Sequence, residues 1–194
     1  MKKATNAKIL DSAETLFRRG GYGASSLDKI ANDAGQSKGA LFHYFKSKKD
    51  ITSQVLQKYA QKSIFEPLDR HFASTHKTKD ALRSWAMEVY QGYADEEYVG
   101  GCLLGNFALE LSDADENVRQ VMAKIFLDLE NSLTNYLKDP ARQGEMIMEP
   151  RQFARILVAT HQGMSMTIKV HKDRNRAGRE FQAFMEMIDH LIKD

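Results

Sequence analysis

Residues 37–48 hold the side chains in this sequence that are best suited to binding a polyanion. The segment combines three aromatic residues, one histidine and three lysines with the small residues Gly39 and Ala40. Lysine binds phosphate or guanine, tyrosine and histidine bind phosphate oxygens, and small residues allow close approach to a groove. This mixture does not suit the surface of a purely structural helix, and it indicates a nucleic-acid-binding segment.

The same segment predicts a very short helix between two others. Ser37 is a favourable N-cap, and Leu41 and Phe45, four residues apart, can bury one face of the helix. Ser47 with Asp50 approximates a capping box and starts the next helix. The polar side chains of the segment then point away from the core.

Residues 25–34 predict a second short helix just before this segment. Ser25 with Asp28 resembles a capping box, and apolar residues recur at helical spacing. Gly35 ends the helix, because glycine readily takes the left-handed conformation. A helix, a turn that contains glycine and a short polar helix form the helix-turn-helix pattern.

Residues 8–51 closely resemble the DNA-binding domain of TetR-type transcriptional repressors, over roughly the first quarter of the chain. The residues that carry the resemblance are Ile9, Leu10, Asp11, Ser12, Ala13, Leu16, Phe17, Gly21, Tyr22, Ser26, Leu27, Asp28, Lys29, Ile30, Ala31, Gly35, Gln36, Ser37, Lys38, Gly39, Ala40, Leu41, Tyr44, Phe45, Lys46, Ser47 and Lys48. The resemblance implies a three-helix head that reads a palindromic operator in double-stranded DNA. It also implies a body that binds a small-molecule effector, and a homodimer formed through the last two helices.

The head offers a defined set of side chains for DNA contacts. These are Ser26, Ser37, Lys38, Gly39, Phe42, His43, Tyr44, Lys46 and Lys48. We expect Lys38 to contact bases, the small and polar neighbours on its helix to line the groove, and Ser26 to act at a helix N-terminus. We expect Tyr44, Lys46 and Lys48 to bind phosphates.

Two of these assignments leave alternatives open. Phe42 either contacts base methyl groups, as an aromatic residue does in some family members, or only packs, since it has no polar group. Family members often carry histidine at the position of Tyr44 and an aromatic residue at that of His43. The division of labour between His43 and Tyr44 therefore stays open.

The charge of the chain is unevenly distributed. The formal net charge is +2, but residues 1–50 carry ten Lys/Arg and five Asp/Glu, a net of +5, and the remainder is mildly acidic. A basic head on an acidic body suggests that the head meets a polyanion. This agrees with the helix-turn-helix pattern.

Length permits one or two domains, and periodicity predicts an all-α protein. The TetR-type resemblance implies two domains, a DNA-binding domain at residues 1–48 and an effector-binding and dimerisation domain at 49–194. The 194 residues are 42% hydrophobic, with three prolines and long segments of helical period. We find no apolar run of the ~18 residues that a membrane span needs, and no signal-peptide pattern. A single cysteine precludes an internal disulfide and fits a cytoplasmic protein.

The body is expected to consist of helices with one buried face. Their approximate ranges are 50–73, 78–93, 102–111, 115–137, 149–171 and 177–193. Pro67 either kinks the first of these or ends it near Phe65. Thr78 is expected to cap the second. The third is apolar almost all round, so we expect it to be buried.

Aromatic and polar groups on the inward faces of these helices predict an effector site. Its expected residues are Trp85, Tyr90, Cys102, Asn106, Phe107 and Phe126. Cys102 follows two glycines at a helix N-terminus, which favours the reactive thiolate. The surrounding sequence resembles a TetR-type branch that includes electrophile-responsive repressors. The alternative is that Cys102 is an inert, small hydrophobic residue.

Motifs for other chemistry are missing from the sequence. There is no glycine-rich phosphate loop, no His-x-x-x-His spacing and no Gly-x-Ser-x-Gly, so we expect no catalytic residue, metal or cofactor. Two alternative functions stay open. One is an enzyme that uses Cys102 with the distant His161, and the other is an architectural DNA-binding protein without an effector.

Overall fold

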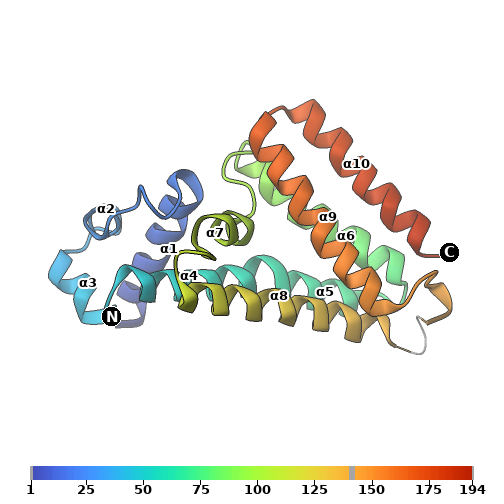
Figure 1. The fold of residues 1–194 in the computed structure, drawn as a ribbon, viewed down its shortest axis with the longest axis horizontal. Coiled ribbons are helices and arrows are strands. Elements are labelled where there is room, and N and C mark those ends of the chain that lie inside the picture. The colour runs from blue at the N-terminus through green and yellow to red at the C-terminus, as the bar shows by residue number, and fades with distance from the viewer. Residues whose placement is uncertain (1, 140–142, 194) are drawn as a thin grey trace. The chain divides into compact units, whose positions relative to one another are not determined.

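The computed structural model describes residues 2–139 and 143–193, and the regular elements in these ranges are helices (Figure 1). The all-α prediction is confirmed. The chain groups into two compact units. We call Met1–Ala60 with Cys102–Ala123 the head unit, and Gln61–Gly101 with Lys124–Asp194 the body unit. These units are defined by packing, whereas a domain division at residues 48 and 49 stays a prediction.

The head unit contains the three expected N-terminal helices, α1 (Lys2–Gly20), α2 (Leu27–Asp33) and α3 (Lys38–Tyr44). The cap of α2 differs from the prediction. Ser26 is the N-cap and accepts the N–H of Lys29, while the hydroxyl of Ser25 is buried and donates to the carbonyl of Gly21. Both residues have the chemistry of a cap, so only the backbone path distinguishes them. Gly35, with φ of +64°, ends the α2 region as expected.

Three further segments complete the head unit. These are α4 (Lys48–Ala60), α7 (Leu103–Leu111) and the start of α8 (Glu116–Leu137). The predicted start of α4 is confirmed, because the N–H of Asp50 donates to Ser47 Oγ and the carboxylate of Asp50 accepts the N–H of Lys46. The core of the head consists of fully buried side chains from several helices, including Ile9, Ala13, Phe17, Ile30, Leu41, Phe45, Ile51, Val55 and Phe107.

Helix α7 differs from its prediction. Leu103, Leu104 and Phe107 are buried as expected, but Leu109 is 80% exposed. The helix was expected to be buried all round because its sequence is apolar on most sides. The buried face of α7 is therefore narrower than the apolar composition of its sequence predicts. Gly100 and Gly101, with φ of 91° and 63°, provide the predicted break before it.

The segment that follows α4 is interrupted. The sequence predicted one helix over residues 50–73, whereas α4 ends at Ala60, a π-helical turn covers Gln61–Phe65 and α5 covers Glu66–Ser74. Pro67 lies in the first turn of α5, where its missing N–H leaves no helical hydrogen bond unmade. The alternative in which the helix ends near Phe65 is therefore wrong, because α5 begins at Glu66 directly after the π-helical turn.

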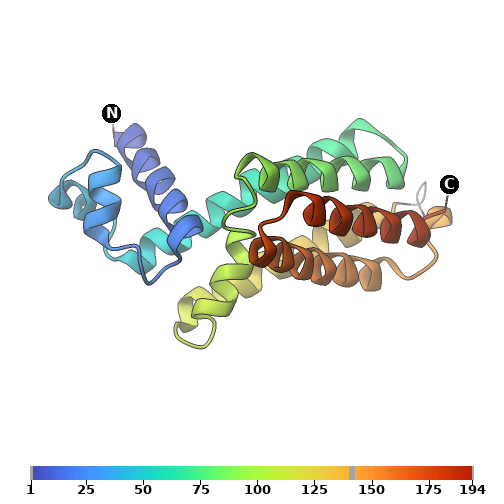
Figure 2. The ribbon, with the colours of Figure 1, turned by 90° about the horizontal axis from the view of Figure 1, so that it is seen from above.

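The body unit is built from α5, α6 (Thr78–Asp95), the rest of α8, a short 3-10 turn (Gln143–Glu145), α9 (Pro150–His171) and α10 (Arg174–Leu191). The prediction that Thr78 caps α6 is wrong. Lys77 is the N-cap, and its side chain makes no capping hydrogen bond. Thr78 is buried instead, and its N–H donates to the carboxylate of Glu145. Helices α9 and α10 lie side by side (Figure 2).

Helices in the part of the chain that the structure describes are all too short or too polar to cross a membrane.

Candidate nucleic-acid interface

Helix α3 is held against the core of the head by one aliphatic and one aromatic side chain, and its other side is exposed. Leu41 and Phe45 are both 0% exposed in the core of the head. Ser37 caps the helix by accepting the N–H of Ala40 at 3.1 Å. The residues exposed on its remaining surface are Ser37, Lys38, Gly39, Phe42 and His43. Five residues predicted to contact DNA therefore lie together on one short element.

Lys38 lies at the N-terminal end of this surface and pairs with Asp28 of α2. Its ammonium nitrogen is 2.8 Å from the Asp28 carboxylate, and the two side chains are 57% and 62% exposed. Ion pairs at such exposed positions contribute little to stability. A base or phosphate can therefore replace Asp28 as the partner of Lys38 at small cost.

Phe42, His43 and Tyr44 form the aromatic part of the surface. Phe42 is 48% exposed, which is unusual for a phenylalanine and leaves its ring available to another molecule. The rings of His43 and Tyr44 meet edge to face, with centroids 5.2 Å apart. His43 is exposed and Tyr44 is half-buried.

The remaining three predicted contacts lie beside α3 and differ in their surroundings. Ser26 and Lys46 are exposed, and Ser26 caps α2. Lys48 is half-buried, and its ammonium donates to the carbonyl oxygen of Tyr22 and lies 3.7 Å from the centroid of the Tyr22 ring. Burial lowers the pKa of Lys48. Phosphate binding by Lys48 therefore requires its ammonium to leave Tyr22.

One residue that supports this surface was not among the sequence-predicted sites. The Glu110 carboxylate on α7 accepts the backbone N–H groups of Tyr22 and Gly23, at 2.9 and 2.8 Å. In the sequence, Cys102, Asn106 and Glu110 are spaced by four on an otherwise apolar helix, so polar side chains there need hydrogen-bond partners. A partner 88 residues away cannot be read from that stripe.

Three of the predicted effector residues belong to the body unit. Trp85 is 2% exposed, and its buried indole Nε1 has no hydrogen-bond partner among the residues that the structure describes. Tyr90 stacks on Phe181, with ring centroids 4.2 Å apart. Phe126 is half-buried on α8.

His161 is buried next to Trp85, whereas the sequence predicts it only as a distant partner of Cys102 in the enzyme alternative. The His161 ring centroid is 6.4 Å from that of Trp85, and His161 Nε2 is 3.1 Å from the Tyr93 hydroxyl. Burial lowers the pKa of His161 to about 4, so the ring is neutral at neutral pH.

The other three predicted effector residues belong to the head unit. Phe107 is fully buried and packs against Phe17, with ring centroids 5.2 Å apart, so it contributes to the core of the head. Asn106 is half-buried. Cys102 is 3% exposed at the N-cap position of α7. Burial raises the pKa of the Tyr59 hydroxyl, which is hydrogen-bonded to the Cys102 thiol.

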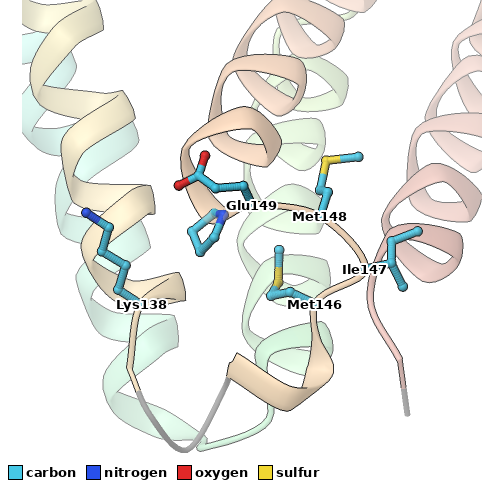
Figure 3. Close-up of a pocket in the computed structure, with 6 residues that line it drawn as sticks. Lys138, Met146, Ile147, Met148 and Glu149 are labelled. Atoms are coloured by element: carbon cyan, nitrogen blue, oxygen red, sulfur yellow. The ribbon is translucent and has the colours of Figure 1, made fainter.

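A surface pocket lies elsewhere in the body unit (Figure 3). Its lining residues are Lys138, Met146, Ile147, Met148, Glu149 and Pro150. They come from the segment after α8 and the approach to α9, and the predicted effector residues do not line this pocket. Across residues 2–139 and 143–193, no group of three or more His, Cys, Asp or Glu is arranged to hold a metal ion.

Comparison with known proteins places both parts of the chain. Residues 9–55 match the family model for bacterial regulatory proteins of the tetR family, and residues 78–184 match the model for the tetracyclin repressor-like C-terminal domain. An HTH-type transcriptional regulator in the lacX 3' region of Lactococcus lactis is 28% identical over 174 residues, which are 88% of this chain and 86% of that protein. The HTH-type transcriptional repressor DhaR of Mycobacterium sp. (strain GP1) is 27% identical over 169 residues, covering 86% and 83% of the two chains.

Solved structures of TetR-family regulators share the fold of this chain. The reduced form of NemR from E. coli superposes with a TM-score of 0.83 at 21% identity, over 97% of each chain, which shows a shared fold. One family model covers the helix-turn-helix surface, and the other covers more than half of the chain. The chain therefore belongs to the TetR family of bacterial transcriptional regulators.

Proposed function

We propose that this protein is a sequence-specific transcriptional repressor that binds a palindromic operator through α3. The observation that carries the proposal is the exposed face of α3, held in place by the fully buried Leu41 and Phe45. A short helix that is fixed on one side and exposes lysine, histidine and glycine on the other fits the major groove. The names of the repressor relatives support repression rather than activation.

We propose that two copies of the chain assemble through α9 and α10. The outer face of α9 carries an exposed stripe of small and apolar residues at helical spacing, consisting of Ile156, Ala159, Gly163, Met166 and Val170. Residues three and four apart share one face of a helix, so this stripe is continuous. A two-fold dimer buries the same surface of both copies and presents two α3 helices to inverted half-sites.

The effector site of the proposed repressor lies in the body unit. Trp85 supports this, because its buried indole N–H has no acceptor within residues 2–139 and 143–193. An unsatisfied buried N–H is costly, and an acceptor on a ligand would satisfy it. Of the predicted effector residues, Trp85 and Tyr90 are those that we propose to contact the ligand. The effector can release the protein from its operator only if it binds more tightly to the conformation that does not bind DNA.

An electrophile is the second candidate for the effector. Cys102 supports it as the one thiol in the sequence, placed at the N-cap position of α7 beside the Tyr59 hydroxyl. The structural relative NemR was solved in a form named as reduced. A thiol-reactive electrophile should then release the operator from the native protein but not from Cys102→Ser. Equal release of both proteins would make Cys102 a structural residue.

The proposed function is tested by selection from a random-sequence DNA duplex library, followed by footprinting and release. We expect the purified protein to enrich one inverted repeat, to protect it against cleavage and to lose it on addition of an inducing small molecule. An architectural DNA-binding protein would show no sequence preference and no release. Steady turnover of a substrate by the purified protein would instead support an enzyme.

A further inference from the structure

Glu110 joins α7 to the turn between α1 and α2 within the head unit. Its Oε2 accepts the N–H of Tyr22 at 2.9 Å, and its Oε1 accepts the N–H of Gly23 at 2.8 Å. Hydrogen bonds to an ionised carboxylate are about twice as strong as those between neutral groups. Both oxygens of Glu110 are therefore committed to two successive backbone donors of one turn.

The turn has a shape that fits this carboxylate. Gly21 has φ of +76°, and a Cβ atom added to it would lie 2.9 Å from Glu110 Oε2. Successive N–H groups next to a left-handed residue form a concavity that binds anions. Gly21 thus provides both the backbone conformation and the room that the carboxylate requires.

Tyr22, at the centre of the turn, is held by three groups of the head. Glu110 binds its N–H, the Lys48 ammonium binds its carbonyl oxygen and the Phe107 ring packs against its ring, with centroids 6.2 Å apart. Burial lowers the pKa of Lys48, and the nearby charge of Glu110 counteracts this by favouring the ammonium form. Phe107 and Glu110 lie three residues apart, so one face of α7 provides both contacts.

The held turn leads directly into the helix-turn-helix. The hydroxyl of buried Ser25 donates to the carbonyl of Gly21 at 2.8 Å, and Ser26 then caps α2. The position of α2 sets that of α3, because the two helices pack on each other. The start of the DNA-reading element therefore depends on the turn that Glu110 binds.

We propose that Glu110 is a positioning residue for operator binding, acting through the α1–α2 turn without touching DNA. This rests on the proposed function. Because Glu110 orders the turn before DNA binds, the free energy of operator binding is not reduced by the entropic cost of ordering the turn. Loss of the carboxylate leaves the head folded but loosens the segment that sets the position of α2 and α3.

The test compares Glu110→Gln with Asp113→Asn, an equal change in charge at an exposed position just after α7. Glutamine offers one acceptor oxygen and places a donor against the second N–H. We expect Glu110→Gln to lower affinity for the duplex enriched by the native protein about tenfold. Affinity for random-sequence duplex and the salt dependence of binding should stay unchanged, because no phosphate contact is lost. Asp113→Asn should match the native protein.

The amide signals of Tyr22 and Gly23 provide a second readout that does not use DNA. In the native protein, both signals should shift as a carboxylate titrates, and Glu110→Gln should abolish that shift. If Glu110→Gln fails to fold, Glu110→Asp keeps the charge but shortens the side chain, and it should lower affinity for the enriched duplex without changing affinity for random duplex.

Several outcomes would overturn the proposal. One is an affinity of Glu110→Gln equal to that of Asp113→Asn. Another is an equal loss on enriched and random duplexes with a weaker salt dependence, which would place Glu110 at the DNA backbone. If the native protein enriches no duplex at all, the proposed function fails, and the amide signals still decide whether Glu110 holds the turn.

Discussion

The three lysines predicted to bind DNA have different surroundings at the level of single residues. Lys38 pairs with Asp28, and Lys48 donates to the Tyr22 carbonyl. Lys46 is exposed between α3 and α4, with its backbone N–H bound to Asp50. Of the two lysines assigned to phosphates, Lys46 is therefore the one whose ammonium can reach DNA without leaving the Tyr22 carbonyl and ring.

Replacing Lys46 with alanine should weaken binding to all DNA sequences by a similar factor. The loss of one phosphate contact should reduce the slope of log K against log salt concentration by about 0.9. Binding titrations at several salt concentrations measure this slope. Lys62→Ala, an exposed lysine of the body unit, is the control and should leave the slope unchanged. An unchanged slope for Lys46→Ala would remove it from the interface.

His161 makes the stability of the body unit depend on pH. Its pKa is lowered by burial to about 4, below the usual 6.5, so the unfolded chain binds the proton more readily between these two values. The free energy of unfolding should therefore fall by up to about 3 kcal/mol as the pH drops from 6.5 to 4, with no contribution from His161 above that range. Urea unfolding at a series of pH values measures this.

The variant His161→Gln provides the comparison, because it keeps a polar group near Tyr93 but does not titrate in this range. It should be less stable at neutral pH and should lose part of the decrease seen on acidification. The same acid dependence in both proteins would assign the effect to other groups.

At the level of elements, the turn between α2 and α3 depends on Gly35. Its φ is +64°, and a Cβ atom there would meet nothing within 4 Å. The cost of a side chain is therefore conformational rather than steric, about 1 kcal/mol for alanine and less for asparagine, which tolerates the left-handed region. Urea unfolding should rank Gly35→Asn above Gly35→Ala in stability. Equal stabilities would show that the turn can relax.

The sequence predicted most of these elements because their signals are local. Apolar spacing predicted the buried Leu41 and Phe45, and glycine predicted the left-handed turn at Gly35. Predictions were wrong where two neighbouring residues carry the same local signal and tertiary packing selects one of them. Ser25 and Ser26 are both possible caps, and the backbone path decides between them by directing the Ser25 hydroxyl to the carbonyl of Gly21.

The candidate site was only partly predictable for the same reason. The exposed side chains of α3 follow from the motif, since its buried residues fix which side faces outward. The partners of Lys48 and Glu110 come from residues 26 and 88 positions away, respectively. Sequence spacing within a helix contains no information about such contacts.

At the level of the whole molecule, the proposed dimer makes a prediction about α9. Gly163 is exposed on the apolar stripe, and a Cβ atom there would meet nothing within 4 Å. Gly163→Glu should therefore leave the chain folded. Because the same surface of both copies lies in a two-fold interface, the substitution places two negative charges there and should dissociate the dimer. Sedimentation equilibrium measures the molecular mass.

Gly92→Glu is a matched control, because Gly92 is also an exposed helical glycine with nothing within 4 Å of an added Cβ. It lies on α6, outside the proposed interface, and should leave the dimer intact. A dimeric Gly163→Glu would place the interface on another face of the molecule.

In the proposed dimer, two α3 helices read the operator from symmetric positions, and Lys38 is the residue on α3 expected to contact bases. Selection from a random duplex library should be run in parallel with the native protein and with Lys38→Ala. The native protein should enrich an inverted repeat whose half-sites are about 34–36 Å apart, or a multiple of that distance. Lys38→Ala should lose base preference at one position in each half-site, equally distant from the centre, at a cost of about 1–3 kcal/mol per lost contact. An identical enriched sequence for both proteins, or a site without two-fold symmetry, would show that α3 does not read the operator in this way.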